Sequence, residues 1–444
     1  MPPLVADAAG ESDVLVARAT PPGVGALAIV RLSGPPGPTL AIARRVAPRL
    51  ALQPVSRRAC LSPFVDEEGS VVDEGLVIWF EAPASATGEE VVELQAHGSP
   101  AIVEALVCAA VRQGARRARP GEFTRRAVVN GKLDLARAEG VGQLAAASSR
   151  GEARRALGLV RGDLSRRVDS LREELLAALV EIEARLDFAE DVEPDGEAAA
   201  LSRVDAVRAA LLVLASEVGV GRPGEALPTV VIVGAPNAGK STLFNALLGE
   251  DRVLVTEVAG TTRDAVAEVV EIAGERVRLV DTAGLRETVE RLERLGVEAT
   301  VRAAAGADLL LLAREAGGAL PGPDGLPDGV PVLLLGTKAD LSGSVRDGEL
   351  RVSARTGEGL PALRREIGLR LGRGDETGVH GALPRQREAL LRAAGALAGV
   401  SPSDPAEMVA AAVRAGLHAL GEITGETATE ELLDRIFSTF CVGK

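Results

Sequence analysis

The residues of this chain with the clearest chemical meaning lie in GAPNAGKST, at positions 234–242. The spacing Gly234-x4-Gly239-Lys240-Ser241 follows the apolar run PTVVIV and precedes LFNALLG, so it predicts a phosphate-binding loop between a buried strand and a helix. Backbone N–H groups and the positive end of the helix would hold phosphates, Lys240 would reach the β and γ phosphates, and the Ser241 hydroxyl would bind Mg²⁺. The predicted nucleotide-binding residues of this loop are Asn237, Ala238, Gly239, Lys240, Ser241 and Thr242.

The motif GTKAD, after another apolar run, indicates which base is bound. Asp340 can accept two hydrogen bonds from the N1 and N2 donors of guanine, and adenine has no such donor pair, so a P-loop ATPase would not need this carboxylate. The alternative role for Asp340 is a helix N-cap. The segment SAR after the next strand is expected to close over the base with its backbone. The predicted base-site residues are Thr337, Lys338, Asp340, Ser353, Ala354 and Arg355.

Two further motifs belong to the phosphate side of the site. DTAG, at 281–284, ends a strand; it places Asp281 near the Mg²⁺ shell and the Gly284 N–H at the γ-phosphate, with Thr282 and Ala283 between them. GTTRD, at 260–264, supplies Thr262 as a second hydroxyl on Mg²⁺. These four elements in this order predict a GTPase. The residue after Gly284 is a leucine, which cannot orient water as a glutamine does there in Ras-type enzymes. The candidates for that task are the acids Glu287, Glu290 and Glu293.

Composition restricts the class of protein. The chain has 444 residues and a net charge of -13, so we expect two or three domains and no non-specific nucleic-acid binding by the whole surface. Residues 112–132 carry seven cations and one acid, and this run is either a solvated face or a local RNA contact. We find neither a membrane span nor a signal peptide and expect a cytoplasmic protein. Cys60, Cys108 and Cys441 show no metal spacing, and reduced thiols are expected for the first two.

Hydrophobic patterns predict a multidomain chain with α/β and all-α parts. Residues 1–125 read as an α+β domain with strands in 14–20, 26–34, 75–83 and 89–98; GVGALA there opens onto a strand, so it is no dinucleotide fingerprint. Residues 126–222 are predicted to be helical, and 220–228 are predicted to form a linker. Residues 223–373 alternate buried strands and helices, which is typical of a parallel sheet. Residues 374–444 are again predicted to be helical. One apolar stripe that ends at Pro194 is formed by Leu164, Val168, Leu171, Leu175, Leu179, Ile182 and Leu186.

Segments outside the GTPase motifs resemble one known family. They are ATPPGVGALAIVRLSGP, TGEEVVELQAHGSP, ARPGEFTRRAVVNGKLDLARAEGV and the terminal ELLDRIFSTFCVGK; together with GAPNAGKSTLFNALLG, VTEVAGTTRD and DTAGLRETVERLERLGVE they are similar to the MnmE (TrmE) tRNA-modification GTPases. The resemblance implies an N-terminal domain that binds tetrahydrofolate and dimerises, a helical domain in two halves, and an inserted Ras-like P-loop GTPase domain. A rival interpretation, a stand-alone GTPase switch in ribosome assembly, would carry an RNA-binding domain or a second G domain, and neither is evident.

The resemblance also implies an activity and its partners. A homodimer, joined by the MnmG-type FAD protein in a heterotetramer or larger complex, would add an aminomethyl-type (carboxymethylaminomethyl) group to C5 of the wobble uridine, position 34, of certain tRNAs. The one-carbon donor would be 5-formyl- or methylene-tetrahydrofolate. GTP would be hydrolysed with Mg²⁺ and with K⁺ in place of an arginine finger.

Matching the family's motifs assigns further site residues. The folate contacts would be Arg31, Glu93, Lys132 and Lys444, whose alternative role is in surface ion pairs. Asn237 would bind K⁺, unless it only serves a left-handed loop; the other K⁺ ligands would be Thr256, Val258 and Thr261. Glu293 would orient the attacking water, and Cys441 would lie near the folate. The chain departs from the family at Thr337, usually Asn, which is expected to weaken a loop-bracing hydrogen bond, and at Val24 and Ser99.

Overall fold

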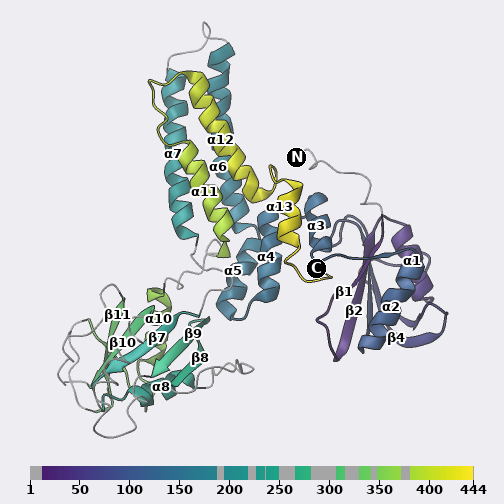
Figure 1. Ribbon diagram of the computed structural model, residues 1–444, viewed down its shortest axis with the longest axis horizontal. Helices are drawn as coiled ribbons and strands as arrows, with labels where there is room; N and C mark the ends of the chain where they lie inside the picture. Colours follow the sequence, from purple (N-terminus) through teal and green to yellow (C-terminus); the bar gives the residue numbers. More distant parts are fainter. Residues whose placement is uncertain are drawn as a thin grey trace. The chain divides into compact units, whose positions relative to one another are not determined.

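The computed structural model describes residues 13–187, 195–218, 227–235, 237–249, 266–281, 307–315, 330–341, 348–371 and 381–443. The chain forms two compact units. The first unit comprises Met1–Ala145, Gly158–Glu217 and Pro384–Lys444, and the second comprises Ala146–Leu157 and Val218–Leu383. Figure 1 shows the helices and strands of both units with their labels.

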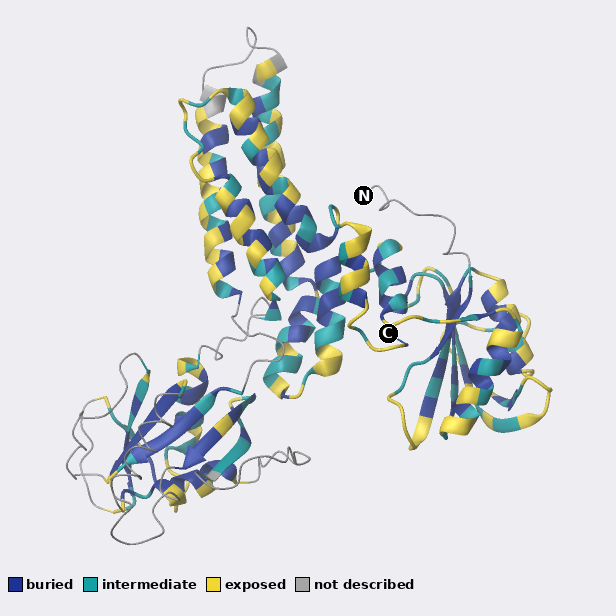
Figure 2. Cartoon of the chain, viewed as in Figure 1, coloured by how far each residue is buried: buried dark blue, intermediate teal, exposed yellow. Residues whose placement is uncertain are grey.

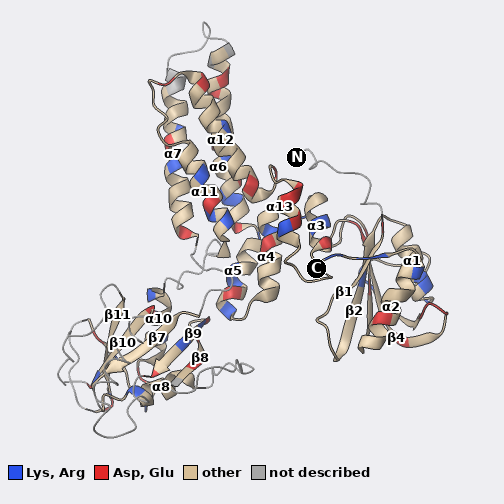
Figure 3. Ribbon diagram, in the orientation of Figure 1, with Lys and Arg blue, Asp and Glu red and all other residues tan. Residues whose placement is uncertain are grey.

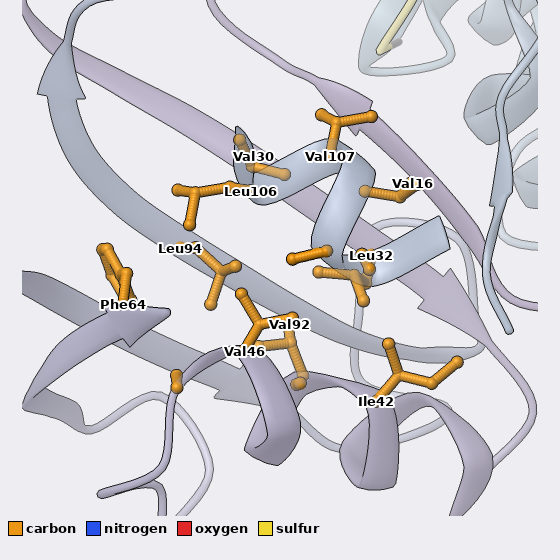
Figure 4. Close-up of a cluster of buried hydrophobic side chains, with 14 of the residues drawn as sticks. Val16, Val30, Leu32, Ile42, Val46, Phe64, Val92, Leu94, Leu106 and Val107 are labelled. Carbon is orange, nitrogen blue, oxygen red and sulfur yellow. The ribbon is translucent and has the colours of Figure 1, made fainter. Parts of the chain in front are cut away.

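The first unit begins with a six-stranded sheet in the order β3-β4-β5-β2-β1-β6. Its strands are β1 (Leu15–Arg18), β2 (Gly25–Gly34), β3 (Ala59–Val65), β4 (Val71–Phe80), β5 (Glu90–Gly98) and β6 (Arg116–Arg117). Helices α1 (Pro38–Val46) and α2 (Pro100–Arg112) pack on the sheet. Alternate residues of β2 (Ala28, Val30 and Leu32) are fully buried in the core between sheet and helices (Figure 4), as the period of a strand requires.

The prediction of an α+β domain here is confirmed, and the predicted strands correspond to β1, β2, β4 and β5. The dinucleotide interpretation of GVGALA was rightly rejected, because this segment runs into strand β2. Strand β3 was missed. It contains Pro63, which lacks a backbone N–H, and such a residue is tolerated because β3 lies at the edge of the sheet.

Three short helices follow the sheet in the first unit: α3 (Glu122–Val129), α4 (Leu135–Ala146) and, near the C-terminus, α13 (Glu430–Phe437). Their apolar side chains share one core, formed by Val128, Leu135, Ala138, Leu433 and Phe437. The chain end runs back along α3, since the N–H of Gly121 donates to the carbonyl of Cys441 at 3.3 Å and Pro120 forms a bridge with Val442.

Helices α6 (Asp163–Asp187), α7 (Asp195–Glu217), α11 (Pro384–Ala396) and α12 (Ala406–Thr424) pack side by side in a bundle (Figure 1). The bundle confirms the prediction of one helical domain in two halves, because α6 and α7 precede the α/β segment and α11 and α12 follow it. Each helix buries one stripe and exposes the rest (Figure 2). Leu164, Val168, Leu175 and Ile182 of the predicted stripe are buried.

The predicted stripe was too long at its C-terminal end. Leu186 is 37% exposed and helix α6 ends at Asp187, whereas residues 188–194, with Pro194, lie outside the described residues.

Glu139 of α4 connects the helices before the α/β segment to those after it. Its buried carboxylate accepts hydrogen bonds from Arg385 and Gln386 of α11. This contact fixes where the chain re-enters the first unit after the α/β segment.

The second unit is built on a six-stranded sheet in the order β12-β11-β10-β7-β9-β8. Its strands are β7 (Thr229–Gly234), β8 (Val266–Ile272), β9 (Glu275–Asp281), β10 (Leu309–Glu315), β11 (Val332–Thr337) and β12 (Leu350–Arg351). All pairs are parallel except β8 with β9. Helices α8 (Lys240–Leu248) and α10 (Leu360–Arg370) contribute to the core on one face, and the opposite face carries a second apolar cluster.

The predicted parallel sheet is therefore confirmed, with the antiparallel edge strand β8 as an unpredicted addition. Helix α5 (Arg150–Val160) begins in the second unit, where the guanidinium of Arg155 donates at 2.9 Å to the carboxylate of Glu275, the first residue of β9. The predicted boundaries at 125, 222 and 373 stay predictions. Within the described ranges, every helix is too short or too polar to cross a bilayer.

Candidate nucleotide-binding site

The predicted phosphate loop lies between strand β7 and helix α8, in the expected strand-loop-helix order. Gly239 stands before the first helical residue with φ of +78°, a left-handed conformation that glycine adopts at little cost. Asn237 is also left-handed, with φ of +63°. Lys240 is buried, and its ammonium donates to the carbonyl of Ala235 at 2.9 Å, so it is folded over the loop that it follows. An N-terminal helix end with a lysine over it suits a bound phosphate chain.

Parallel strands bring the other predicted residues to the same edge of the sheet. Strand β7 pairs with β9 on one side and with β10 on the other, and the register sets Ile232 opposite Asp281 and Gly234 opposite Ala313. The crevice at the carboxyl ends of strands is the usual ligand site of such sheets. The phosphate loop follows β7, the buried Asp281 is the last residue of β9, and Thr337 of the TKAD motif is the last residue of β11. All three thus lie at carboxyl ends of these strands.

Asp340 is held as an acceptor by two neighbours from the SAR segment. The Ser353 hydroxyl donates to its Oδ1 at 2.7 Å, and Nε of Arg355 lies 3.2 Å from its Oδ2. The hydrogen bond from Ser353, with the charge of Arg355, lowers the pKa of Asp340 although burial opposes this. The carboxylate therefore stays ionised near neutral pH, as a guanine acceptor must be. The described residues bring Asp340, Ser353 and Arg355 together; the helix N-cap alternative falls on 342–347, outside the described residues.

Thr337 links the base side of the site to the phosphate side. Its Oγ1 lies 2.7 Å from the carbonyl oxygen of Ala238 in the phosphate loop and 2.9 Å from that of Arg314 on β10. A hydroxyl has one proton, so it donates to one of these carbonyls at a time, whereas an asparagine amide has two N–H donors. The brace is present, and its predicted weakness relative to asparagine stays a prediction. Sequence reasoning missed the contact with Arg314 because the two residues lie on different strands.

Several predicted site residues lie outside the described residues, namely Thr256, Val258, Thr261, Thr262, Thr282, Ala283, Gly284, Glu293 and Lys444. Of the residues predicted around the metal ions, Asn237, Ser241 and Asp281 lie within the described residues. Ser241 is exposed in the first turn of α8, and Asp281 ends the neighbouring strand. Hydroxyl and carboxylate oxygens fit Mg²⁺, and the exposed side-chain carbonyl of Asn237 is an oxygen donor that fits K⁺.

Comparison with known proteins decides the family. The family model for the GTP-binding protein TrmE N-terminus matches residues 14–132, and that for the MnmE helical domain matches residues 135–441. The tRNA modification GTPase MnmE of Myxococcus xanthus is 44% identical over 441 residues, which cover 98% of this chain and 99% of that protein. The chain belongs to the MnmE family of tRNA modification GTPases. It is therefore a GTP hydrolase with a P-loop GTPase domain.

Other members of the MnmE family show the same coverage. The Acidiphilium cryptum protein is 41% identical over 442 residues, covering 98% of this chain and 99% of its own.

Among solved structures, Aquifex aeolicus Era with GDP·AlF₄⁻ bound matches 40% of this chain and 69% of its own at 27% identity, with a TM-score of 0.26. The G domain of FeoB from T. maritima matches 33% of this chain and 99% of its own at 22% identity, with a TM-score of 0.24.

The structure describes three of the residues that the MnmE resemblance assigns to folate, and all three belong to the first unit. Arg31 and Glu93 are direct cross-strand neighbours, and Nη2 of Arg31 donates to Glu93 Oε1 at 2.7 Å. The guanidinium also lies 5.9 Å from the Phe123 ring centroid and 3.4 Å from the carbonyl oxygen of Gly443. The two residues thus form a partly buried ion pair beside Gly443, and their contact with folate stays a prediction. Lys132 instead packs near Gly88, before β5.

The departures from the family pattern and the basic run also have places in the structure. Val24 is 90% exposed before β2, Ser99 precedes α2, and Cys441 is exposed.

Within the described residues, most cations of the run 112–132 have acidic partners, so red and blue are interleaved around α3 (Figure 3). Arg126 is even buried, between Asp13 and Glu89. These pairs favour a structural role for the run over RNA contact.

Proposed function

We propose that this GTPase hydrolyses GTP in a K⁺-activated manner to drive modification of the wobble uridine of certain tRNAs. With an MnmG-type FAD protein and a tetrahydrofolate one-carbon donor, it would add a carboxymethylaminomethyl-type group to C5 of uridine 34. The observation that carries the proposal is the similarity to tRNA modification GTPases along almost the whole chain. A stand-alone GTPase switch would need to share only the second unit.

The chain's own residues have distinct tasks in the proposed hydrolysis. Lys240 binds the β and γ phosphates, and Ser241, Thr262 and Asp281 hold or orient Mg²⁺ and its waters. Asp340 accepts the guanine N–H donors. Glu293 orients the attacking water. K⁺, held by Asn237, Thr256, Val258 and Thr261, would supply positive charge near the phosphates, where charge develops in the transition state.

The one-carbon donor is proposed to bind in the first unit. Arg31, Lys132 and Lys444 offer cations that suit the carboxylates of a folate, and Glu93 offers a carboxylate that suits an amino-pyrimidine edge. Support for this placement is the position of Gly443, the residue before Lys444, next to Arg31. A homodimer through the N-terminal domain and a cytoplasmic site of action are part of the same proposal.

Mass spectrometry of tRNA nucleosides tests the proposal. Cells that lack this protein should lose the modified wobble uridine, and the wild-type chain should restore it. Lys240→Ala should not restore it, because the phosphates lose their cation, whereas Arg365→Ala removes an exposed cation of α10 outside the predicted site and should restore it. An unchanged nucleoside profile in the deletion strain, together with a defect in ribosome assembly, would support the rival GTPase switch.

A further inference from the structure

The second unit contains a buried ion pair that none of the nucleotide-site motifs includes. Arg314 lies in strand β10 and Glu349 stands directly before strand β12, and their side chains are 3% and 1% exposed. Nε of Arg314 donates to Glu349 Oε1 at 2.9 Å, and Nη2 donates to Oε2. Two parallel hydrogen bonds give the pair a defined geometry. Buried charges need such partners, and removing one of them is strongly destabilising.

Arg314 is connected to the phosphate loop through its backbone. Its carbonyl oxygen is one of the two acceptors of the Thr337 hydroxyl, and the other acceptor is the carbonyl of Ala238. Thr337 is the last residue of β11 and directly precedes the Lys-Ala-Asp of the base motif. Thr337 thus connects Arg314, one member of the ion pair, to both the phosphate loop and the base motif.

Glu349 holds the other side of the base site. Strand β12 has only two residues, lies at the edge of the sheet and pairs with Leu335 and Gly336 of β11. So short a strand has few ladder hydrogen bonds to fix its position. Directly after it, the Val352 N–H donates to the Gly336 carbonyl at 2.9 Å and the Ser353 hydroxyl donates to Asp340. The Glu349 carboxylate thus anchors the strand that delivers Ser353 to Asp340.

We propose that Arg314 and Glu349 are positioning residues for guanine recognition. By fixing β12 relative to β10 across β11, the pair sets the Ser353 hydroxyl and, through its hydrogen bond to Oδ1, orients the Asp340 carboxylate for the two N–H donors of the base. Neither residue is among the predicted nucleotide contacts. The inference rests on the proposed role of Asp340 as the guanine acceptor, which an Asp340→Asn exchange tests separately through its preference for xanthosine triphosphate.

The test compares steady-state hydrolysis of GTP and of ITP, whose base lacks the N2 amine. Glu349→Gln removes the charge that pairs with Arg314, and Arg314→Lys keeps the charge but loses the two-pronged geometry. Val270→Ala, fully buried in β8 at the opposite edge of the sheet from β12, is the matched control because it lowers stability away from the base loops. Thermal unfolding of each variant measures how much stability is lost, and Arg314→Lys gives a folded variant if Glu349→Gln does not fold.

The expected result is a split between KM and kcat. Glu349→Gln should raise the KM for GTP about tenfold, as for the loss of one hydrogen bond to a charged group, and change kcat much less. The preference for GTP over ITP should narrow, and Arg314→Lys should shift both quantities in the same direction by less. The proposal is overturned if both variants keep the wild-type KM and preference, or if Val270→Ala at equal loss of melting temperature changes them as much.

Discussion

At the scale of single residues, the proposed potassium site depends most on Asn237. Its side chain is exposed and its left-handed backbone presents it at the turn before Gly239. If its amide oxygen binds K⁺, hydrolysis should be much faster in KCl than in NaCl. Asn237→Ala should lose most of this stimulation, on the order of a hundredfold, the usual cost of removing one group that stabilises transition-state charge.

Initial rates of GTP hydrolysis in matched KCl and NaCl buffers measure this effect. The control is Asn245→Ala, which removes another exposed amide, within helix α8, and should keep the stimulation. Equal rates in the two salts, together with no effect of Asn237→Ala, would contradict the proposal. In that case Asn237 serves only the loop conformation.

Residues whose meaning depends on spacing along the chain could be predicted, and those that depend on distant contacts could not. The phosphate loop and the TKAD and SAR motifs each lie within a few residues, so their roles follow from the sequence. Thr337 meets Ala238 across 99 positions and Arg314 meets Glu349 across 35. The loop-bracing hydrogen bond of Thr337 was expected from the family resemblance, although its acceptors were not. No local pattern predicts which strands pair, so the contact between Arg314 and Glu349 could not be foreseen.

At the scale of elements, helix α3 is held to the sheet of the first unit by charge. Glu122, in its first turn, accepts hydrogen bonds from Arg116 of β6 at 2.7 Å and from the Arg119 N–H at 2.7 Å. Burial raises the pKa of Glu122, but these hydrogen bonds and the charge of Arg116 outweigh it and leave the pKa below 4.5. The pKa of Asp13, which also pairs with Arg116, is lowered as well.

These shifts predict an acid-sensitive first unit. A carboxylate whose folded pKa is below its unfolded pKa contributes stability above the unfolded value and loses that stability as pH falls through the folded value. The melting temperature should therefore fall from about pH 5 downwards. Glu122→Gln should lower it by a few °C at pH 7, roughly 2–4 °C for each kcal/mol lost, and flatten the acid dependence.

Thermal unfolding between pH 3 and pH 8 measures this dependence, followed by circular dichroism. Glu81→Gln, at an exposed position after β4, is the control and should leave the curve unchanged. If Glu122→Gln retains the wild-type curve at both ends of the range, the contact between α3 and β6 does not depend on this carboxylate.

Some elements could not be predicted because their local signals are weak. Strand β3 has a proline at an edge position, and β8 precedes the turn at Ala273 and Gly274 with mixed polar and apolar residues. Their strand form comes from pairing with β4 and β9. By contrast, the buried strands β7, β10 and β11 are almost wholly apolar, and the sequence alone identifies them.

At the scale of the whole molecule, the chain places a GTPase domain inside a helical domain. Helical periodicity on both sides of the α/β segment predicted this arrangement, and the bundle of α6, α7, α11 and α12 confirms it. The buried contact of Glu139 with Arg385 and Gln386 joins residues 246 and 247 positions apart and could not be predicted. It closes the first unit around the insertion point.

Asp340, three residues after β11, is proposed to accept the two N–H donors of guanine and so to make GTP the substrate that this family member hydrolyses. The most direct measurement is kcat/KM for GTP and for xanthosine triphosphate with the wild-type chain and Asp340→Asn. The account predicts a reversal, with GTP preferred by the wild type and xanthosine triphosphate by the variant, because the amide donates where the carboxylate accepted. A variant that folds and still prefers GTP by the wild-type factor would contradict it.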